Sequence, residues 1–153
     1  MKLTRPAVAF FTFGALAGMS SVALGAFAVH GLGKMVSDPE RAVSLFKQAT
    51  DFQMYHALSL ILVALASERL DAGLARTTMR LSALLMCCSI VFFPGALYSA
   101  AFGGPQFFAP WGGFTSMTGW LLFGIGALLS LRSSSASDRA PSAIGLRQAH
   151  AAE

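Results

Sequence analysis

Two histidines, a glutamine and a tyrosine interrupt the apolar stretches of this sequence, and they are its best candidates for chemistry. His30 ends the stretch LGAFAVHGL, Gln53 and His56 lie within FQMYHALSL, and Tyr98 stands near the end of a later apolar run. Imidazole nitrogens can hold a haem or a metal ion, or relay protons near neutral pH. We therefore treat these four residues as a candidate polar cluster for a small ligand, a cofactor or a proton.

The same residues have two simpler explanations, and the sequence alone leaves all three open. Polar and aromatic side chains are common where a membrane helix meets the interface, and polar groups also link helices through hydrogen bonds. A structural zinc site needs four ligands, and Asp51 is the only carboxylate close to the histidines. The sequence has no recognisable nucleophile with its base, phosphate-binding loop or carboxylate pair. We therefore expect no catalytic residues, no metal, no cofactor and no enzyme.

The composition places these residues in a membrane rather than in a water-soluble domain. Of the 153 residues, 55% are hydrophobic and only 12% are charged, whereas soluble domains carry about 25% charged residues. A chain of this length exposes too much surface to cover with so few charges, so lipid must face part of it. The net charge of +4 does not indicate a nucleic-acid partner, because the basic residues form no stripe.

Four apolar segments approach or exceed the roughly 20 residues that a membrane-spanning helix needs. We therefore expect an all-α membrane protein, with four transmembrane helices in a bundle as a single domain at 1–131. The Ser- and Ala-rich remainder, 132–153, is expected to be a disordered cytoplasmic tail. The expected helices lie at about 6–30, 39–67, 79–101 and 111–131.

The second expected helix has an amphipathic beginning. Asp38 can cap its N-terminus and Pro39 suits its first position. Apolar residues recur at spacings of three and four from Ala42 to His56, so one helix face stays apolar through the polar lead-in. We expect one continuous helix. The alternative is a kink near Thr50, with the lead-in at 39–51 lying flat on the membrane.

Positive charges predict which side of the membrane the loops occupy, because cytoplasmic loops are enriched in Lys and Arg. If both termini are cytoplasmic, eight of the 11 Lys and Arg residues lie inside, and the three outside are Lys34, Arg41 and Lys47. We therefore expect both termini in the cytoplasm. Residues 1–28 also resemble a secretory signal that ends in AFA. Their apolar core exceeds the usual length of about 7–15 residues, so we expect a retained helix.

Small residues predict where helices approach each other closely. Gly14 and Gly18 are four residues apart in the first expected helix, Gly25 follows in the same helix, and Gly119 lies in the fourth. Glycine at such spacings lets two helix backbones come into contact. These four glycines are therefore candidate helix-packing residues, either within the bundle or at a contact with another protein.

The sequence also resembles a known family of small membrane proteins. LGAFAVHGL resembles that family's first-helix signature, and FKQATDFQMYHALSLILVAL resembles its second. FPGALYSAAFGG, followed by APWGGFTSMTGWLLF, resembles its third and fourth. By these motifs the chain is similar to the domain of unknown function 423 family, which includes transmembrane protein 256. The resemblance covers about residues 8–131 and implies four helices in a bacterial inner or a mitochondrial membrane, without an established reaction.

Two functional hypotheses follow for a multi-pass protein of the cell (inner) membrane, or of a mitochondrial membrane in a eukaryote. The first is a structural or accessory component that packs through its glycine-rich faces with other membrane proteins or with a second copy. The alternative is binding or transport of a small ligand, cofactor or proton at an outer-side site around His30 and His56. The alternative requires these two side chains to face each other across the first two helices.

Overall fold

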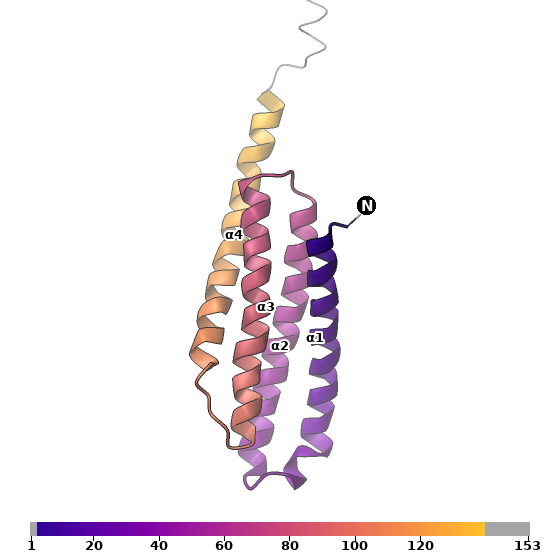
Figure 1. The fold of residues 1–153 in the computed structure, drawn as a ribbon, viewed down its shortest axis with the longest axis vertical. Helices are drawn as coiled ribbons and strands as arrows, with labels where there is room; N and C mark the ends of the chain where they lie inside the picture. The colour runs from indigo at the N-terminus through magenta and orange to yellow at the C-terminus, as the bar shows by residue number, and fades with distance from the viewer. Residues whose placement is uncertain (1–2, 140–153) are drawn as a thin grey trace, which may run out of the picture.

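The computed structural model describes residues 3–139, and every regular element in that range is helical (Figure 1). Four of the helices are long and apolar enough to cross a membrane. This confirms the prediction of an all-α protein with four candidate spans. The elements are α1 (Arg5–His30), the short 3-10 helix η1 (Leu32–Lys34), α2 (Pro39–Glu68), α3 (Leu74–Ala101) and α4 (Ala109–Arg139).

The four long helices follow one another in space in the same order as in the sequence (Figure 1). α1 packs along α2, α2 along α3 and α3 along α4, whereas α1 makes only a slight contact with α3. We expected a bundle, but within residues 3–139 the helices form an open layer, because α1 and α4 make no extensive contact with each other. α1 begins and α4 ends at the same end of the molecule, here called the terminus end (Figure 1). The opposite end, which carries η1, is called the η1 end.

α2 and α3 form the centre of this layer. In the most apolar part of each span, 50% of the residues of α2 and 44% of those of α3 are buried, against 22% for α1 and 17% for α4. Leu60 and Val63 of α2 pack with Ala83 and Met86 of α3 in the main apolar core. Because α1 and α4 each cover only one side of this pair, their remaining faces are left for lipid or another protein.

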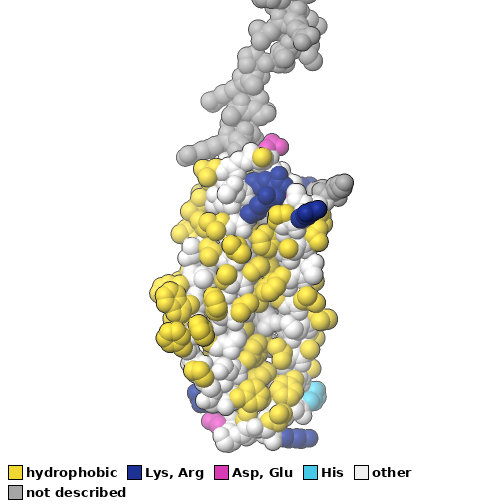
Figure 2. Space-filling model, in the orientation of Figure 1, with side chains coloured by type: hydrophobic (Ala, Val, Ile, Leu, Met, Phe, Trp, Pro, Cys, Tyr) yellow, Lys and Arg dark blue, Asp and Glu magenta, His cyan; other side chains and the backbone are white. Residues whose placement is uncertain are grey.

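Charged and apolar side chains are separated along the long axis of the molecule. Hydrophobic side chains cover the middle of the face shown in Figure 2, and Lys, Arg and acidic side chains gather at its two ends. Large apolar side chains such as Val22, Leu62 and Leu84 are more than half exposed. An exposed apolar band between two charged ends is the surface that a bilayer requires.

α2 is one continuous helix, so the amphipathic lead-in and the apolar part are not separate elements. The Asp38 side chain accepts a hydrogen bond from the Arg41 backbone N–H at 3.1 Å, and Pro39 is the first helical residue. Both features are those the sequence predicts. The alternative with a break at Thr50 is therefore not found, and the Thr50 hydroxyl instead donates to the Lys47 carbonyl within the helix.

Two helix boundaries differ from those expected. α3 begins at Leu74, five residues before the expected start. The ion pair between Arg76 and Glu68 holds this additional polar turn in the helix. α4 continues beyond Leu131 to Arg139, so it extends into the segment that we expected to be a tail. Serine and alanine, which dominate that segment, are compatible with a helix. The rest of the expected tail, 140–153, lies outside the described residues.

Candidate functional site

Gln53 is buried between three helices and connects them through its carboxamide. Its Nε2 donates to the Ala17 carbonyl oxygen and to Ser20 Oγ of α1, each at 2.8 Å. Its Oε1 accepts a hydrogen bond from the Tyr98 hydroxyl of α3 at 3.0 Å. Only 5% of Gln53 is exposed. The structure thus brings together two of the four residues of the candidate cluster, Gln53 and Tyr98.

One backbone carbonyl fixes the direction of every hydrogen bond in this network. The Ala17 oxygen can only accept, so the carboxamide nitrogen of Gln53 must face it. The carboxamide oxygen then faces Tyr98, whose hydroxyl must donate, and Ser20 Oγ accepts the second N–H of Gln53. The Ser20 hydroxyl in turn donates to the Ala17 carbonyl at 3.1 Å. Every side-chain N–H and O–H of Gln53, Ser20 and Tyr98 is therefore already donated.

His56 takes part in a second network, which leads to α4. Its Nε2 lies 2.6 Å from Ser116 Oγ and accepts the indole N–H of Trp120 at 3.2 Å, while its Nδ1 lies 3.0 Å from the Phe52 carbonyl oxygen. The carbonyl can only accept and the indole can only donate, so the ring carries its proton on Nδ1. The Phe52 ring stacks on the imidazole, with the ring centroids 3.9 Å apart. Both ring nitrogens of His56 are therefore engaged within the protein.

His30 belongs to neither network. It is the last residue of α1 and is exposed at the η1 end. Phe27, one turn earlier in α1, packs against Phe46 of α2. His56 lies ten residues further along α2 than Phe46, which is about 15 Å at the helical rise of 1.5 Å per residue. The two histidines do not face each other, so the arrangement that a shared His30–His56 site requires is not found.

The candidate residues Gln53, Tyr98 and His56 form hydrogen bonds between helices, and these bonds belong to two separate networks. One joins α1, α2 and α3 through Gln53, and the other joins α2 and α4 through His56. Within residues 3–139, no group of three or more His, Cys, Asp or Glu side chains is placed to hold a metal ion. The polar chemistry of these two networks is therefore that of neutral amide, hydroxyl, imidazole and indole groups.

The glycines of α1 differ in how closely they approach α2. A Cβ atom at Gly14 would lie 2.8 Å from Ile61 Cγ1 and 3.1 Å from the Ala57 carbonyl oxygen. A Cβ atom at Gly18 would have its nearest neighbour on α2 at 3.9 Å, and one at Gly25 would meet nothing within 4 Å. Gly14 is thus at a tight contact between helices inside the protein, Gly18 is at an ordinary contact, and Gly25 is at none.

Three of the five glycines of α4 lie against α3, and two of these three are outside the four candidate packing residues. A Cβ atom at Gly119 would lie 3.3 Å from Met86 Cγ. One at Gly126 would lie 3.0 Å from a methionine side chain of α3, and one at Gly112 would overlap the backbone of Phe93. Gly112, Gly119 and Gly126 recur every seven residues, which places them on one helix face. This seven-residue spacing was the sequence signal for the complete set.

A cluster of charged residues at the terminus end was also absent from the predicted site. The Glu68 carboxylate accepts hydrogen bonds from the Thr4 backbone N–H at 2.9 Å and from the Thr4 hydroxyl at 2.8 Å. It also pairs with Arg76 at 2.9 Å and with Arg80 at 3.2 Å, and its side chain is only 3% exposed. The cluster ties the start of α1 to the end of α2 and the start of α3. A lone carboxylate at the end of an apolar span, followed by two arginines four residues apart, was the signal in the sequence.

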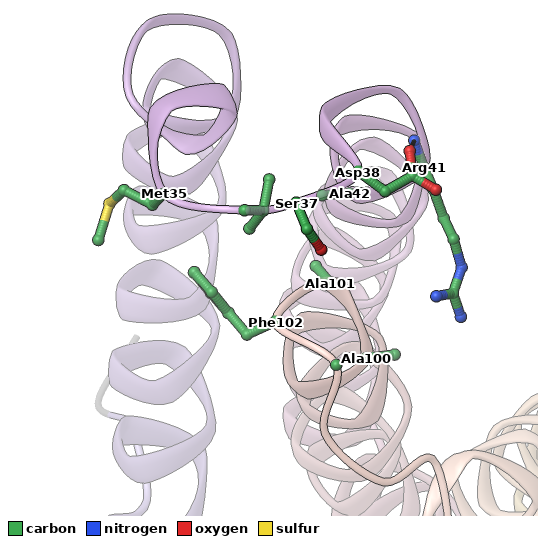
Figure 3. Close-up of a pocket in the computed structure, with 10 residues that line it drawn as sticks. Met35, Ser37, Asp38, Arg41, Ala42, Ala100, Ala101 and Phe102 are labelled. Atoms are coloured by element: carbon green, nitrogen blue, oxygen red, sulfur yellow. Dashed lines mark hydrogen bonds between the residues drawn. The ribbon is translucent and has the colours of Figure 1, made fainter.

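A small pocket of about 250 Å³ lies at the η1 end, between the start of α2 and the end of α3 (Figure 3). Its walls come from the η1–α2 connection, the first turn of α2 and the last turn of α3. The Asp38 carboxylate is used as the α2 cap, and Arg41 lines the pocket together with Ala100 and Ala101 (Figure 3). The four residues of the candidate cluster do not line this pocket, so it is separate from both hydrogen-bond networks.

Comparison with known proteins finds relatives of this sequence among membrane proteins of unknown function. The model of the family described as "Protein of unknown function (DUF423)" matches residues 24–119. A UPF0382 membrane protein of Staphylococcus epidermidis is 35% identical over 122 residues, which cover 78% of this chain and 94% of that protein. A UPF0382 membrane protein of Haemophilus influenzae is 35% identical over 124 residues, covering 79% and 94% of the two chains.

A more distant relative carries a more specific location in its name. The UPF0382 inner membrane protein YgdD of Escherichia coli is 29% identical over 119 residues, covering 76% of this chain and 86% of that protein. No solved structure matches the chain significantly. The relatives are thus similar over nearly their whole lengths, and their names give a membrane location without an activity.

Proposed function

This chain belongs to the family of proteins of unknown function DUF423, and from that premise we propose that it is a non-enzymatic accessory protein of the inner membrane. In this role it packs against a second copy of itself or against another membrane protein. The chain has four helices that can span a membrane, and its relatives are membrane proteins, one of them named as an inner membrane protein. What we propose beyond this membrane location is that the protein contacts a partner and catalyses no reaction.

The observation that carries this proposal is the outward face of α4. α4 packs mainly on α3, and only 17% of the residues in the most apolar part of α4 are buried. Large apolar side chains follow its other face at spacings of three and four residues, which makes them a continuous ridge along the helix. Gly124, exposed beside this ridge, leaves room for a second helix backbone. The residues of this α4 ridge are Phe114, Met117, Leu121, Ile125 and Leu128.

The glycine-rich faces that the sequence offered for a partner are largely used inside the protein. Gly14 is in tight contact with α2, and Gly119 with α3. A partner would therefore meet the α4 ridge rather than these glycines, which is a correction to the sequence-based hypothesis. An apolar ridge beside a small residue suits such a partner, because helices in lipid associate through close packing.

The two buried networks support a role without chemistry. The side-chain donors of Gln53, Ser20 and Tyr98 are all used, and both nitrogens of His56 have partners. A general acid or base must be able to reach a substrate atom, and these groups instead reach neighbouring helices. Their arrangement favours holding the helices in register over catalysis.

Charge at the two ends supports an orientation with both termini in the cytoplasm. The terminus end carries Arg5, Arg69, Arg76 and Arg80, whereas the η1 end carries Lys34, Arg41 and Lys47. The richer end is expected on the cytoplasmic side.

Site-specific photo-crosslinking in native membranes tests the partner contact. A benzophenone is attached to Leu121→Cys on the α4 ridge or, as a control, to Leu62→Cys on α2, after Cys87 and Cys88 are replaced by Ser. Leu121 and Leu62 are 64% and 59% exposed, so both probes face out of the molecule to a similar extent. We expect one discrete crosslinked species from Leu121→Cys and none from Leu62→Cys. Monomers alone at both positions would contradict the proposal, and a species of twice the chain mass would identify the partner as a second copy.

A further inference from the structure

A groove runs between α1 and α3, with α2 as its floor. Its volume is about 480 Å³, which lies within the range of about 300–1,000 Å³ found for small-molecule sites. Phe13, Leu16 and Met19 of α1 form one wall, and Ile90 and Val91 of α3 form the other. No residue of α4 lines the groove, so it is independent of the α4 ridge and of the function proposed above.

The floor of this groove is polar, although its walls are apolar. Ser20, Gln53 and Tyr98, which form the first hydrogen-bond network, all line it. Gln53 is buried, whereas Ser20 and Tyr98 are partly exposed. No charged residue is among the lining residues. A ligand here would lie among apolar helices, where a charged head would lack a counter-ion, so the site favours an uncharged molecule.

The hydrogen-bond directions decide which kind of uncharged head would fit. The side-chain protons of Ser20, Gln53 and Tyr98 are all donated within the network, as the Ala17 carbonyl requires. Each of their oxygens has two acceptor positions, and at least one position on each remains available. The floor therefore offers acceptors without donors. A ketone, ester or ether oxygen gains nothing here, whereas a hydroxyl hydrogen finds a partner.

We propose that this groove binds an uncharged, membrane-soluble amphiphile whose head carries a free hydroxyl group. The hydroxyl donates its one hydrogen bond to the oxygen atom of Ser20 or of Tyr98 on the floor. The apolar tail lies along the side chains of Leu16 and Met19 on one wall and of Ile90 and Val91 on the other. The recognition element is the donor-saturated network, which discriminates an alcohol from an otherwise identical ether.

The test compares two probes that are identical except at the head group, where a methyl group replaces the hydroxyl hydrogen in one of them. The full chain is placed in phosphatidylcholine nanodiscs, because this lipid has no free hydroxyl. A long-chain alcohol with a diazirine in its tail is compared with its methyl ether, and labelled peptides are identified by mass spectrometry. We expect saturable labelling of groove residues by the alcohol, about two- to tenfold above the ether, which is the range of one net hydrogen bond. Equal or non-saturable labelling by the two probes would overturn the proposal.

Two variants separate groove binding from a general effect on the fold. Gly95 lines the groove, and a Cβ atom there would meet nothing within 4 Å. Gly95→Leu should therefore fill the groove and abolish alcohol labelling, while the thermal unfolding midpoint stays close to that of the parent. Gly25→Leu is the matched control, because a Cβ atom at Gly25 likewise meets nothing within 4 Å and Gly25 does not line the groove. Labelling that persists in Gly95→Leu, or is lost in Gly25→Leu, would contradict the assignment.

The second variant changes the hydrogen-bond chemistry with little change of shape. Ser20→Ala removes the oxygen that accepts the second N–H of Gln53, so the floor gains a free donor. The ether can now accept this hydrogen bond. The preference for the alcohol over the ether should therefore fall towards one, while total labelling of the groove persists. An unchanged preference in Ser20→Ala would show that the network does not select the head group, and it would overturn the proposal even if Gly95→Leu failed to fold.

Discussion

The indole N–H of Trp120 donates to Nε2 of His56 across 3.2 Å and so ties α4 to α2, although α4 packs mainly on α3. Ser116, one turn earlier in α4, reaches the same nitrogen at 2.6 Å. Two polar side chains from one face of α4 therefore contact the same ring nitrogen of His56. Since α4 is the least buried of the four helices, this polar link fixes its rotation and its distance from the centre of the protein.

Replacing His56 by leucine should weaken this link measurably. The Trp120 indole N–H would lose its acceptor, and the free energy of unfolding in detergent should fall by about 1–2 kcal/mol, as for hydrogen bonds between membrane helices. In a Trp111→Phe background, the fluorescence of Trp120 alone should change. His30→Ala serves as the control, because His30 is exposed at the end of α1. Equal stability of the His56→Leu variant and the parent would refute the structural role of His56.

Gly14→Ala and Gly25→Ala form a matched pair on one helix. The added methyl group at position 14 would lie 2.8 Å from Ile61 Cγ1 and 3.1 Å from a backbone oxygen, so α1 must move away from α2. We expect Gly14→Ala to lower the free energy of unfolding by about 1–3 kcal/mol, as overpacking does. Gly25→Ala meets no atom within 4 Å and should be neutral or stabilising by up to about 1 kcal/mol. Detergent-titration unfolding measures both, and a reversed order would contradict the α1–α2 contact.

Glu68→Gln should loosen the start of α1. The neutral amide keeps the shape of the side chain but gives up its ion pairs with Arg76 and Arg80. Two partly buried guanidinium groups would then lie near each other without a carboxylate between them. We expect a lower thermal unfolding midpoint and faster hydrogen exchange at the Thr4 amide, which donates to Glu68. Asp71→Asn is the control, since it makes the same charge change at an exposed position nearby. If the Thr4 amide hydrogen exchanges at the same rate in both variants, the cluster does not anchor α1.

The proposed orientation predicts which engineered cysteines an impermeant maleimide can reach in intact spheroplasts. Met35→Cys lies in the connection after η1, where Met35 is 65% exposed, and it should be labelled directly. Ala72→Cys lies between α2 and α3, at the terminus end, and should react only after the membrane is permeabilised. Cys87 and Cys88 are replaced by Ser in both proteins. The reverse pattern would place the termini outside and overturn the charge-based orientation.

The sequence was sufficient to predict the helical elements, because the signals for them are local. An uninterrupted apolar run predicts a span, and Asp38 with Pro39 predicts the start of α2. The extra turns of α3 and α4 were not predicted, because hydropathy does not mark polar turns such as the one around Arg76. That turn is held by its pairing with Glu68, a residue of another helix.

The candidate site was predicted only in part. Gln53 and Tyr98 belong together, as the cluster proposed, because each is a polar group that needs a partner in an apolar setting. The grouping of His30 with His56 rests on the predicted topology, which puts both towards the outer side of the membrane. Depth along a helix says nothing about the direction in which a side chain points, and His56 faces α4 instead.

The sequence by itself determined that this is a membrane protein and how many helices can cross the membrane. Only the tertiary structure decided which face of each helix points inward, and hence that Gln53 joins α1 to α3 while His56 binds α4. The physical reason is that lipid is as apolar as the protein interior, so hydrophobic periodicity cannot distinguish the buried face of a spanning helix from its outer face. That choice is made by hydrogen bonds and close backbone contacts between residues far apart in the chain.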